Sequence, residues 1–190
     1  MRIIAGKFRG RKLIKFNTIK IKPTKDKTRE SIFNIIISYL KNNIKNSDLP
    51  FEGFNVLDIF AGTGALGLES ISRGADTVTF IEKSAENLRV LYKNINHLKV
   101  NEQVKIIKRS IKKVKKIDGK FDVIFMDPPY QMDLIFKKTL KKIFDFKIIK
   151  KETIIVLEHA KNKKITIPNY FEVIKEKNYG SSNLTLIKIK

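Results

Sequence analysis

Apolar and polar stretches alternate along the chain in a pattern that predicts strands and helices in turn. From residue 54 onward, short apolar runs predict buried strands in "FNVLDIF", "DTVTFIE", "VKIIKR", "FDVIFMD" and "ETIIVLEH". Apolar residues at helical spacing predict helices in "TGALGLESISRG", "SAENLRVLYKNINHL" and "LIFKKTLKKIFDF", and a short basic helix is expected after the third strand. Strands that alternate with amphipathic helices indicate an α/β fold, a mostly parallel sheet with helices on both faces.

The two ends of the chain depart from this alternation. Residues 1–22 predict short strands around "AGKFRG", with turns at Gly6 and Gly10, and "KPTKDKTRESIFNIIISYL" then has helical character. No helix is expected between the last two apolar stretches, "YFEVIKEKNYG" and "NLTLIKIK", so these strands should pair antiparallel. We therefore expect a small basic β extension over residues 1–22 and one domain over residues 23–190.

The charge changes this picture from a generic fold to one with a polyanionic partner. Forty Lys and Arg against 19 Asp and Glu give a net charge of +21, which favours nucleic acid. The chain is rich in Lys, Ile and Asn throughout, so compositional drift is the alternative, and a membrane surface is a weaker one. Part of the charge is clustered near the N-terminus, and the candidate residues for contact with nucleic acid are Arg2, Lys7, Arg9, Arg11 and Lys12.

Composition also excludes several kinds of chemistry. The chain has no cysteine, which rules out disulfides, thiolate catalysis and zinc–cysteine sites, and no metal is expected. No apolar run approaches the roughly 20 residues that span a bilayer, and the N-terminus lacks the features of a signal peptide. We therefore expect a cytoplasmic protein without a membrane partner.

A glycine-rich loop joins the first sheet strand to its helix in "LDIFAGTGALGLE". Gly62, Gly64 and Gly67 fit G-x-G-x-x-G between a strand and a helix, a pattern shared by enzymes that bind dinucleotides or S-adenosylmethionine. Glu82 ends the next strand, where an acid accepts hydrogen bonds from ribose hydroxyls. Asp58 lies within the first strand and suits a cationic cofactor, because it can orient the loop and face an ammonium group. The alternative is that Asp58 only satisfies local backbone donors and Glu82 is a solvated strand end.

The second motif, Asp127-Pro128-Pro129-Tyr130, follows the strand that should lie beside the first one. Ligands bind at the carboxyl ends of such strands, so Asp127 and the glycine loop should share one crevice. The Asp127 carboxylate and the Pro128 carbonyl can accept hydrogen bonds from an exocyclic amine of a nucleobase and aim its lone pair at a methyl group. The prolines fix φ, and Tyr130 offers a face for stacking the base. The alternative is a Pro-Pro turn without a chemical role.

With both motifs in place, the sequence resembles the class I S-adenosylmethionine-dependent methyltransferases. More narrowly, it resembles the RsmD family, which methylates guanine N2 in bacterial 16S ribosomal RNA. The similarity runs nearly end to end and rests on "MRIIAGKFRGRKL", "KPTKDKTRESIFN", "AGTGALGLESISRGA", "FIEK", "DPPY" and "NYGSSNLTL". It implies a Rossmann-like sheet with a seventh, antiparallel strand. It also implies S-adenosylmethionine as cofactor and 16S rRNA within a nearly or fully assembled small subunit as substrate. Separately from the resemblance, we expect a monomer.

The resemblance also implies roles for individual residues. Asp58, Gly62, Gly64 and Glu82 would hold the cofactor, and Asp127 to Tyr130 the target base. Thr24, Asp26, Arg29 and Phe33 fall in an upstream block that borders the cofactor pocket. Where the family usually has Asp or Asn to read the adenine of the cofactor, this chain offers Ser110. His97 and His159 are expected at the surface or at helix ends. Glu158, at the end of a strand, could touch the site, but a solvated strand end is favoured.

Three other functions stay open from the sequence alone. The DPPY motif is shared with enzymes that methylate adenine N6 in rRNA or DNA. An NAD-dependent oxidoreductase would use the glycine loop and Glu82, but it leaves Asp127 to Tyr130 unexplained. A non-catalytic RNA-binding protein would need only the positive charge.

Overall fold

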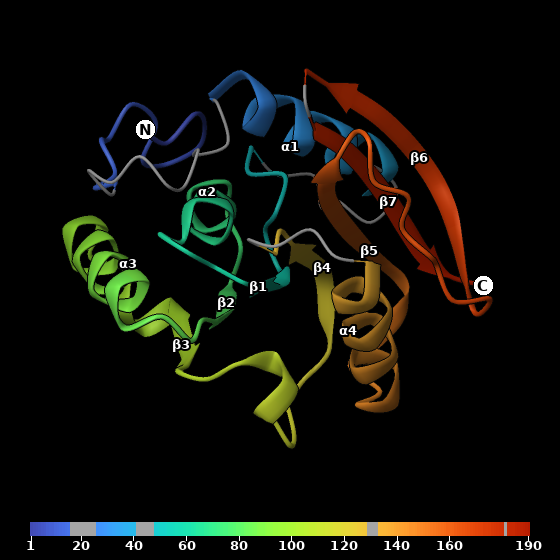
Figure 1. Ribbon diagram of the computed structural model, residues 1–190. Helices are drawn as coiled ribbons and strands as arrows, with labels where there is room; N and C mark the ends of the chain where they lie inside the picture. The colour runs from blue at the N-terminus through green and yellow to red at the C-terminus, as the bar shows by residue number, and fades with distance from the viewer. Residues whose placement is uncertain (16–25, 41–47, 129–132, 181) are drawn as a thin grey trace.

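The alternating pattern of the sequence becomes a seven-stranded sheet flanked by helices in the computed structural model, which describes residues 1–15, 26–40, 48–128, 133–180 and 182–190 (Figure 1). The helices are α1 (Asp26–Leu40), α2 (Ala65–Ser72), α3 (Ala85–Leu98) and α4 (Asp133–Asp145), with 3-10 turns η2 (Asn101–Gln103) and η3 (Ile111–Lys113). The strands are β1 (Asn55–Ile59), β2 (Thr77–Ile81), β3 (Val104–Ile107), β4 (Phe121–Met126), β5 (Ile149–Ala160), β6 (Phe171–Tyr179) and β7 (Ser182–Ile189). The expected short basic helix is the single turn η3.

The strands lie in the order β3-β2-β1-β4-β5-β7-β6. The first five of these pair parallel, and β7 is antiparallel to both β5 and β6. The predicted Rossmann-like sheet with an antiparallel last strand is therefore confirmed. Because the chain moves outward from β1 to β3 and then returns to β4 on the other side of β1, the strand order reverses between β1 and β4. In open α/β sheets, ligands bind at the carboxyl ends of the strands at such a point.

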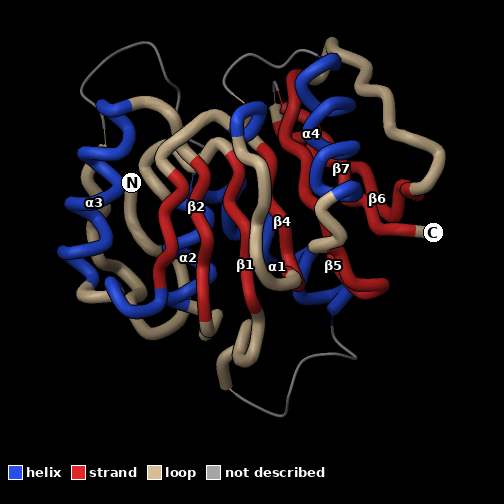
Figure 2. The backbone as a smooth tube through the Cα atoms, turned by 90° about the horizontal axis from the view of Figure 1, so that it is seen from below, coloured by secondary structure: helices blue, strands red, loops and turns tan. Residues whose placement is uncertain are grey.

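Two apolar cores fill the two faces of this sheet, as the alternation of side chains along each strand requires. On one face, Val56, Phe80 and Phe125 pack with residues of α1, α2 and α3. On the other face, Leu57 and Ile124 pack with residues of α4 and of the segment around η3. Figure 2 shows α4 on the near side of the sheet and α1 and α2 behind it. Among the described helices, none is long and apolar enough to cross a membrane.

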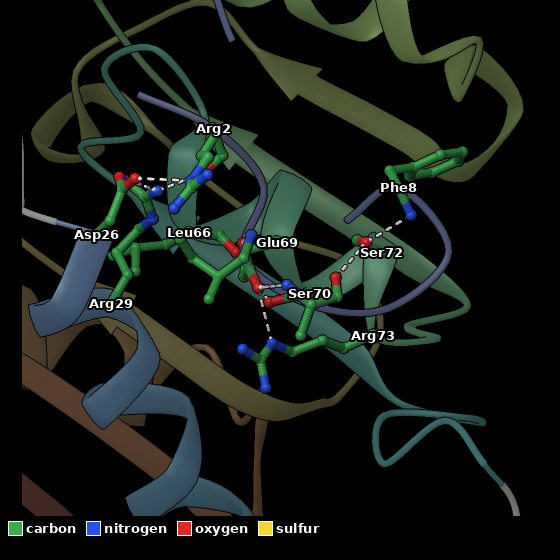
Figure 3. A network of polar contacts seen from close by, with 11 residues as sticks. Arg2, Phe8, Asp26, Arg29, Leu66, Glu69, Ser70, Ser72 and Arg73 are labelled. Carbon is green, nitrogen blue, oxygen red and sulfur yellow. Dashed lines mark hydrogen bonds and ion pairs between the residues drawn. The ribbon is translucent and has the colours of Figure 1, made fainter. Parts of the chain in front are cut away.

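Residues 1–15, called here the N-terminal segment, lie against α2 (Figures 1 and 3). The short strands expected here are reduced to one isolated antiparallel bridge between Arg2 and Lys12. Residues 5–10 form turns instead, and four backbone N–H groups of the segment donate to side chains of α2 and α3. Ile3 and Leu13 are buried and join the core on the helix side of the sheet. The segment is therefore an integral part of that face.

A buried carboxylate on α2 holds this segment in place (Figure 3). Glu69, which has no exposed surface, accepts hydrogen bonds from the backbone N–H groups of Ile4 and Ala5, at 2.8 and 3.0 Å. Its charge is balanced by Arg73, whose Nε lies 2.9 Å from Glu69 Oε1. A buried charge is tolerated when it is paired and fully hydrogen-bonded, as it is here. Ser72 adds further bonds: its hydroxyl donates to the Ala5 carbonyl at 2.5 Å, and its backbone carbonyl accepts from the Lys7 N–H at 2.7 Å.

The two glycines of the segment allow a test of this contact. Both have a positive φ, 81° at Gly6 and 83° at Gly10, so an alanine pays the same backbone cost of about 1–2 kcal/mol at either site. A Cβ at Gly6 would lie 1.8 Å from the backbone oxygen of Ser72, whereas a Cβ at Gly10 would meet nothing within 4 Å. We predict that Gly6→Ala lowers the free energy of unfolding by about 1–3 kcal/mol more than Gly10→Ala, as measured by urea denaturation. Equal unfolding midpoints would show that the segment does not pack on α2 as described.

Candidate active site

The glycine loop leaves the carboxyl edge of the sheet through an unusual backbone conformation. Phe60, directly after β1, has φ 68°, a left-handed conformation that is uncommon for a residue with a Cβ. The N–H groups of Phe60 and Ala61 both donate to the Ile81 carbonyl at the end of β2, at 3.0 and 3.2 Å. These bonds redirect the chain across the end of β2, and α2 starts directly after Gly64, whose φ is 80°. The predicted strand–loop–helix context of the motif is thus present.

Asp58 fixes the start of α2 from inside the sheet. It is 3 % exposed, and its Oδ2 accepts a hydrogen bond from the Gly67 N–H at 3.0 Å. Burial raises the pKa of Asp58 to about 7; the Gly67 hydrogen bond opposes this shift, and the Glu82 carboxylate adds to it. Asp58 therefore does satisfy a local backbone donor. One hydrogen bond is little for a buried carboxylate, and the carboxyl group changes its charge near neutral pH.

Glu82 closes the other side of the loop. Its Oε2 accepts from the Gly62 N–H at 2.8 Å and from Asn87 Nδ2 at 3.0 Å. Its Oε1 accepts from the N–H groups of Lys83 and Ser84 at 2.7 and 2.8 Å. Glu82 is only 7 % exposed, so the alternative of a solvated strand end is wrong. With four donors, the carboxylate is held in one orientation beside the loop.

The three motif glycines serve different purposes. A Cβ at Gly64 would lie 2.4 Å from Leu91 of α3, and one at Gly67 would lie 2.3 Å from the ring of Phe80. These two positions therefore need glycine for packing inside the protein. A Cβ at Gly62 would meet only the Phe60 carbonyl oxygen, at 4.0 Å. Gly62 is the position where the loop leaves room for a ligand to approach its backbone.

Asp127 directly follows β4, and the register of the sheet places it on the same face as the other acids. Asp58 pairs with Phe125 and with Phe80 in the parallel ladders, so it shares their face. Because side chains alternate, Asp127 and Glu82, each two residues further on, project to that face as well. The adjacent parallel pair Met126 and Leu157 places Glu158 next to Asp127 by the same rule. The carboxyl ends of β1, β2, β4 and β5 thus bring four acids to one edge.

This crowding has an electrostatic consequence. Burial raises the pKa of Asp127 well above its usual range, and the neighbouring carboxylates of Glu158 and Asp58 raise it further. Carboxyl groups that crowd at one edge of a sheet indicate a site built for a positively charged or hydrogen-bond-donating ligand.

Glu158 is the site residue that sequence reasoning ranked too low, because contact with the site was considered but not favoured. It was expected at a solvated strand end, but it is half-buried and lies close enough to Asp127 to shift its pKa. Its position at the end of β5, beside the DPPY strand, was the available signal.

His159 was also expected in the wrong environment. It is 4 % exposed, and its Nε2 lies 3.0 Å from Thr185 Oγ1. The strand pairing of β5 with β7 buries it; His97 is exposed as expected.

The remaining candidates divide by position. Ser110 is half-buried, follows β3 and precedes η3, at the same carboxyl edge of the sheet.

The upstream block contributes an ion pair and a core residue. Asp26 and Arg29 bind each other at 2.9 Å, and Arg29 also donates to the Arg2 carbonyl at 2.5 Å (Figure 3). Phe33 is a core residue against which Arg73 stacks, 4.5 Å from the ring centroid. Pro128 is buried, whereas Thr24, Pro129, Tyr130 and the boundary at residues 22 and 23 lie outside the described residues.

The five basic residues proposed to contact RNA all lie exposed on the N-terminal segment. Arg11 stacks on Phe8 at 5.0 Å from the ring centroid, and Arg2 lies 3.4 Å from Asp26. Arg2 and Arg9 line a cleft of about 390 Å³ between the segment and the start of α1, together with Lys27. Within the described part of the chain, no three His, Cys, Asp or Glu side chains are grouped to hold a metal ion.

The raised pKa of Asp58 predicts a specific dependence of stability on pH. Between about pH 4 and 7 the folded protein keeps a proton on Asp58 that the unfolded chain has lost, so the stabilisation is complete below pH 4 and is lost as the pH rises to 7. Asp58→Asn keeps an oxygen for Gly67 and has no proton to lose. As the pH rises through this range, we expect the free energy of unfolding of the variant to increase relative to that of the wild type by up to about 1.4 kcal/mol per pH unit.

Urea denaturation of both proteins at several pH values measures this difference. The difference between the two proteins reports Asp58 together with its electrostatic effect on Asp127, whose pKa it helps to raise. Parallel pH profiles for wild type and variant would contradict the assignment.

Comparisons with known proteins agree with this geometry. A protein from Buchnera aphidicola named "Ribosomal RNA small subunit methyltransferase D" is 35 % identical over 176 residues, which cover 92 % of this chain and 86 % of that protein. The Haemophilus influenzae protein of the same name is 34 % identical over 95 % of this chain and 89 % of its own length. The solved structure described as "Putative methyltransferase yhhF from Escherichia coli" superposes with a TM-score of 0.80 at 28 % identity, covering 100 % of this chain and 98 % of that one.

The family described as "Conserved hypothetical protein 95" matches residues 1–188, and the upstream block, the glycine loop and the DPPY strand all lie within this range. Since the match spans nearly the whole chain and the relatives are covered over most of their length, the protein belongs to this family, the RsmD family that its sequence motifs indicated.

Proposed function

We propose that the protein transfers a methyl group from S-adenosylmethionine to the exocyclic N2 amine of a guanine in 16S ribosomal RNA of the small subunit. Family membership supports the coarser conclusion, an S-adenosylmethionine-dependent rRNA methyltransferase. The observation that carries the proposal is the position of Asp127 on the same face and edge of the sheet as Asp58 and Glu82, beside the glycine loop.

The residues at this edge fit the cofactor. Glu82, oriented by four donors, would accept the ribose hydroxyls, and Ser110 would lie beside the adenine. Gly62 gives the ligand access to the loop backbone. Asp58 and Asp127 would gain from a cationic ligand, because a positive charge lowers the pKa values that burial and mutual repulsion have raised. When bound, S-adenosylmethionine supplies an activated methyl group on a positively charged sulfur.

The chain's own part in the reaction is to hold the amine and to take its proton. Asp127 and the Pro128 carbonyl would accept hydrogen bonds from the two N–H groups, so that the nitrogen lone pair faces the methyl group. As the N–C bond forms and the bond to sulfur breaks, the amine loses a proton. The raised pKa of Asp127 makes one of its Oδ atoms a suitable acceptor, and Glu158 lies next to it. Pro129 would fix the turn, and Tyr130 would stack on a base that has left its helix.

The exposed basic residues of the N-terminal segment would bind RNA phosphates. Their place on the α2 face of the sheet, the face that also carries the four acids, supports a substrate that reaches from the segment to the site. We also propose that the protein acts in the cytoplasm as a monomer and that residues 1–22 contact the RNA. An adenine-N6 methyltransferase is the second candidate, because an amine held by Asp127 does not by itself identify the base.

The experiment is methyl transfer from labelled S-adenosylmethionine to small subunits that lack the modification, followed by identification of the nucleoside by mass spectrometry. We expect N2-methylguanine in 16S rRNA, and a rate that falls by about 10² or more in Asp127→Asn, because the amide oxygen still accepts a hydrogen bond from the amine but cannot take its proton. Affinity for S-adenosylhomocysteine, which carries no charge on its sulfur, should change little. The control is Asp118→Asn, which removes the same charge from an exposed residue in the loop before β4.

Label found only in N6-methyladenine or only in DNA would refute the guanine assignment in favour of the second candidate. Full activity of Asp127→Asn would refute the role of the DPPY carboxylate.

A further inference from the structure

The side chain of Asn94 connects two parts of the protein that the proposed function uses separately. Asn94 lies on α3 and has no exposed surface. Its Oδ1 accepts a hydrogen bond from the Ile14 N–H at 2.7 Å, and its Nδ2 donates to the Ile14 carbonyl at 3.1 Å. The same Nδ2 donates to the Thr63 carbonyl at 3.0 Å. One amide therefore joins the N-terminal segment to the middle of the glycine loop.

These bonds use most of what the amide can offer. An asparagine side chain has two N–H donors and one carbonyl acceptor, and here both donors and the acceptor are used by backbone groups. Each bond depends on the position of its backbone partner rather than on a side chain that could adjust. A shift of Ile14 would cost two bonds to a buried polar group and would move the donor that holds Thr63.

The surroundings make this connection stiff. Leu91, one turn before Asn94 on α3, packs against Gly64, so the same face of α3 contacts the loop at two positions one turn apart. Leu13 is buried next to Ile14, whereas the Ile14 side chain is 43 % exposed, so the backbone of this residue is fixed although its side chain is not packed. The other anchors of the segment, Glu69 and Ser72, hold it to α2, downstream of the loop.

We infer that Asn94 is a positioning residue that couples the N-terminal segment to the glycine loop, so that RNA bound by the segment strengthens binding of the cofactor. This inference rests on the proposed function for the identity of both ligands. Each ligand restricts the same connected backbone, so the second to bind pays less of the ordering cost. By linkage, the cofactor strengthens RNA binding by the same factor.

Equilibrium dialysis tests the coupling, with labelled S-adenosylhomocysteine as probe and purified small subunits as the RNA ligand. We expect saturating subunits to tighten S-adenosylhomocysteine binding about 5-fold or more in the wild type. In Asn94→Ala this factor should fall to within about 2-fold of unity, because no side chain then joins Ile14 to Thr63. Asn96→Ala is the matched control: the same residue type, two positions along α3, exposed and expected to keep the coupling.

A second Asn94 variant and a measurement on the wild type keep the test decisive if Asn94→Ala does not fold. Asn94→Asp keeps an acceptor for the Ile14 N–H but loses the donors to the Ile14 and Thr63 carbonyls, and should also lose the coupling. In the wild type, subunit binding should slow amide hydrogen exchange in residues 61–64, where no folding question arises. Unchanged exchange there, or coupling that survives in both Asn94 variants, would overturn the inference.

Binding measurements on two triple variants distinguish this inference from the proposed function. The triple variant Lys7→Ala/Arg9→Ala/Lys12→Ala should weaken subunit binding and its salt dependence, while Lys161→Ala/Lys163→Ala/Lys164→Ala, of equal charge change, should not. If the wild type binds neither S-adenosylhomocysteine nor small subunits, the proposed function is refuted and the inference with it. Binding of both probes without coupling would refute the inference alone.

Discussion

The site depends on two buried carboxylates that hold one glycine loop from opposite sides. Asp58 binds the Gly67 N–H from within β1, and Glu82 binds the Gly62 N–H from the end of β2. Together they fix the path of the loop between a left-handed turn at Phe60 and the start of α2. A buried carboxylate is costly unless it is paired, so these bonds are the condition under which the sheet can place acids at its ligand-binding edge. Asp58 accepts one such hydrogen bond and has a raised pKa, so its burial is only partly compensated within the protein.

The N-terminal segment depends on a third buried carboxylate. Glu69 sits one turn along α2 from the loop and binds the segment's backbone, while Arg73 balances its charge and stacks on Phe33 of α1. The same helix therefore begins at the cofactor loop and carries the segment proposed to bind RNA. This arrangement explains why a segment with little secondary structure of its own can stand in a fixed place: its bonds go to buried side chains of α2 and α3.

The sequence was most informative where chemistry and periodicity coincide. The parallel strands, the antiparallel last strand and the neighbourhood of β1 and β4 all follow from apolar runs and from the rule that ligand sites form at strand ends. Glu158 and His159 were misplaced because burial at a strand end depends on which strand pairs beside it, and that pairing is not local. The role of Asn94 could not be predicted from the sequence. A polar residue on an amphipathic helix is expected to face solvent, and Asn94 is buried only because the N-terminal segment covers it. Gly64 and Gly67 were expected to serve a ligand, but their lack of a Cβ also serves the packing against Leu91 and Phe80.

The most direct test of the account is a crystal structure of the protein with S-adenosylhomocysteine bound. The account predicts the ribose hydroxyls at Glu82, the adenine beside Ser110, the amino-acid portion near Asp58, and the sulfur facing Asp127 across the end of β4. It also predicts that the bond between Asn94 and Thr63 is kept in the complex. A ligand bound away from the carboxyl ends of β1 and β4, or one whose sulfur points away from Asp127, would contradict the claim that these acids form one methyl-transfer site.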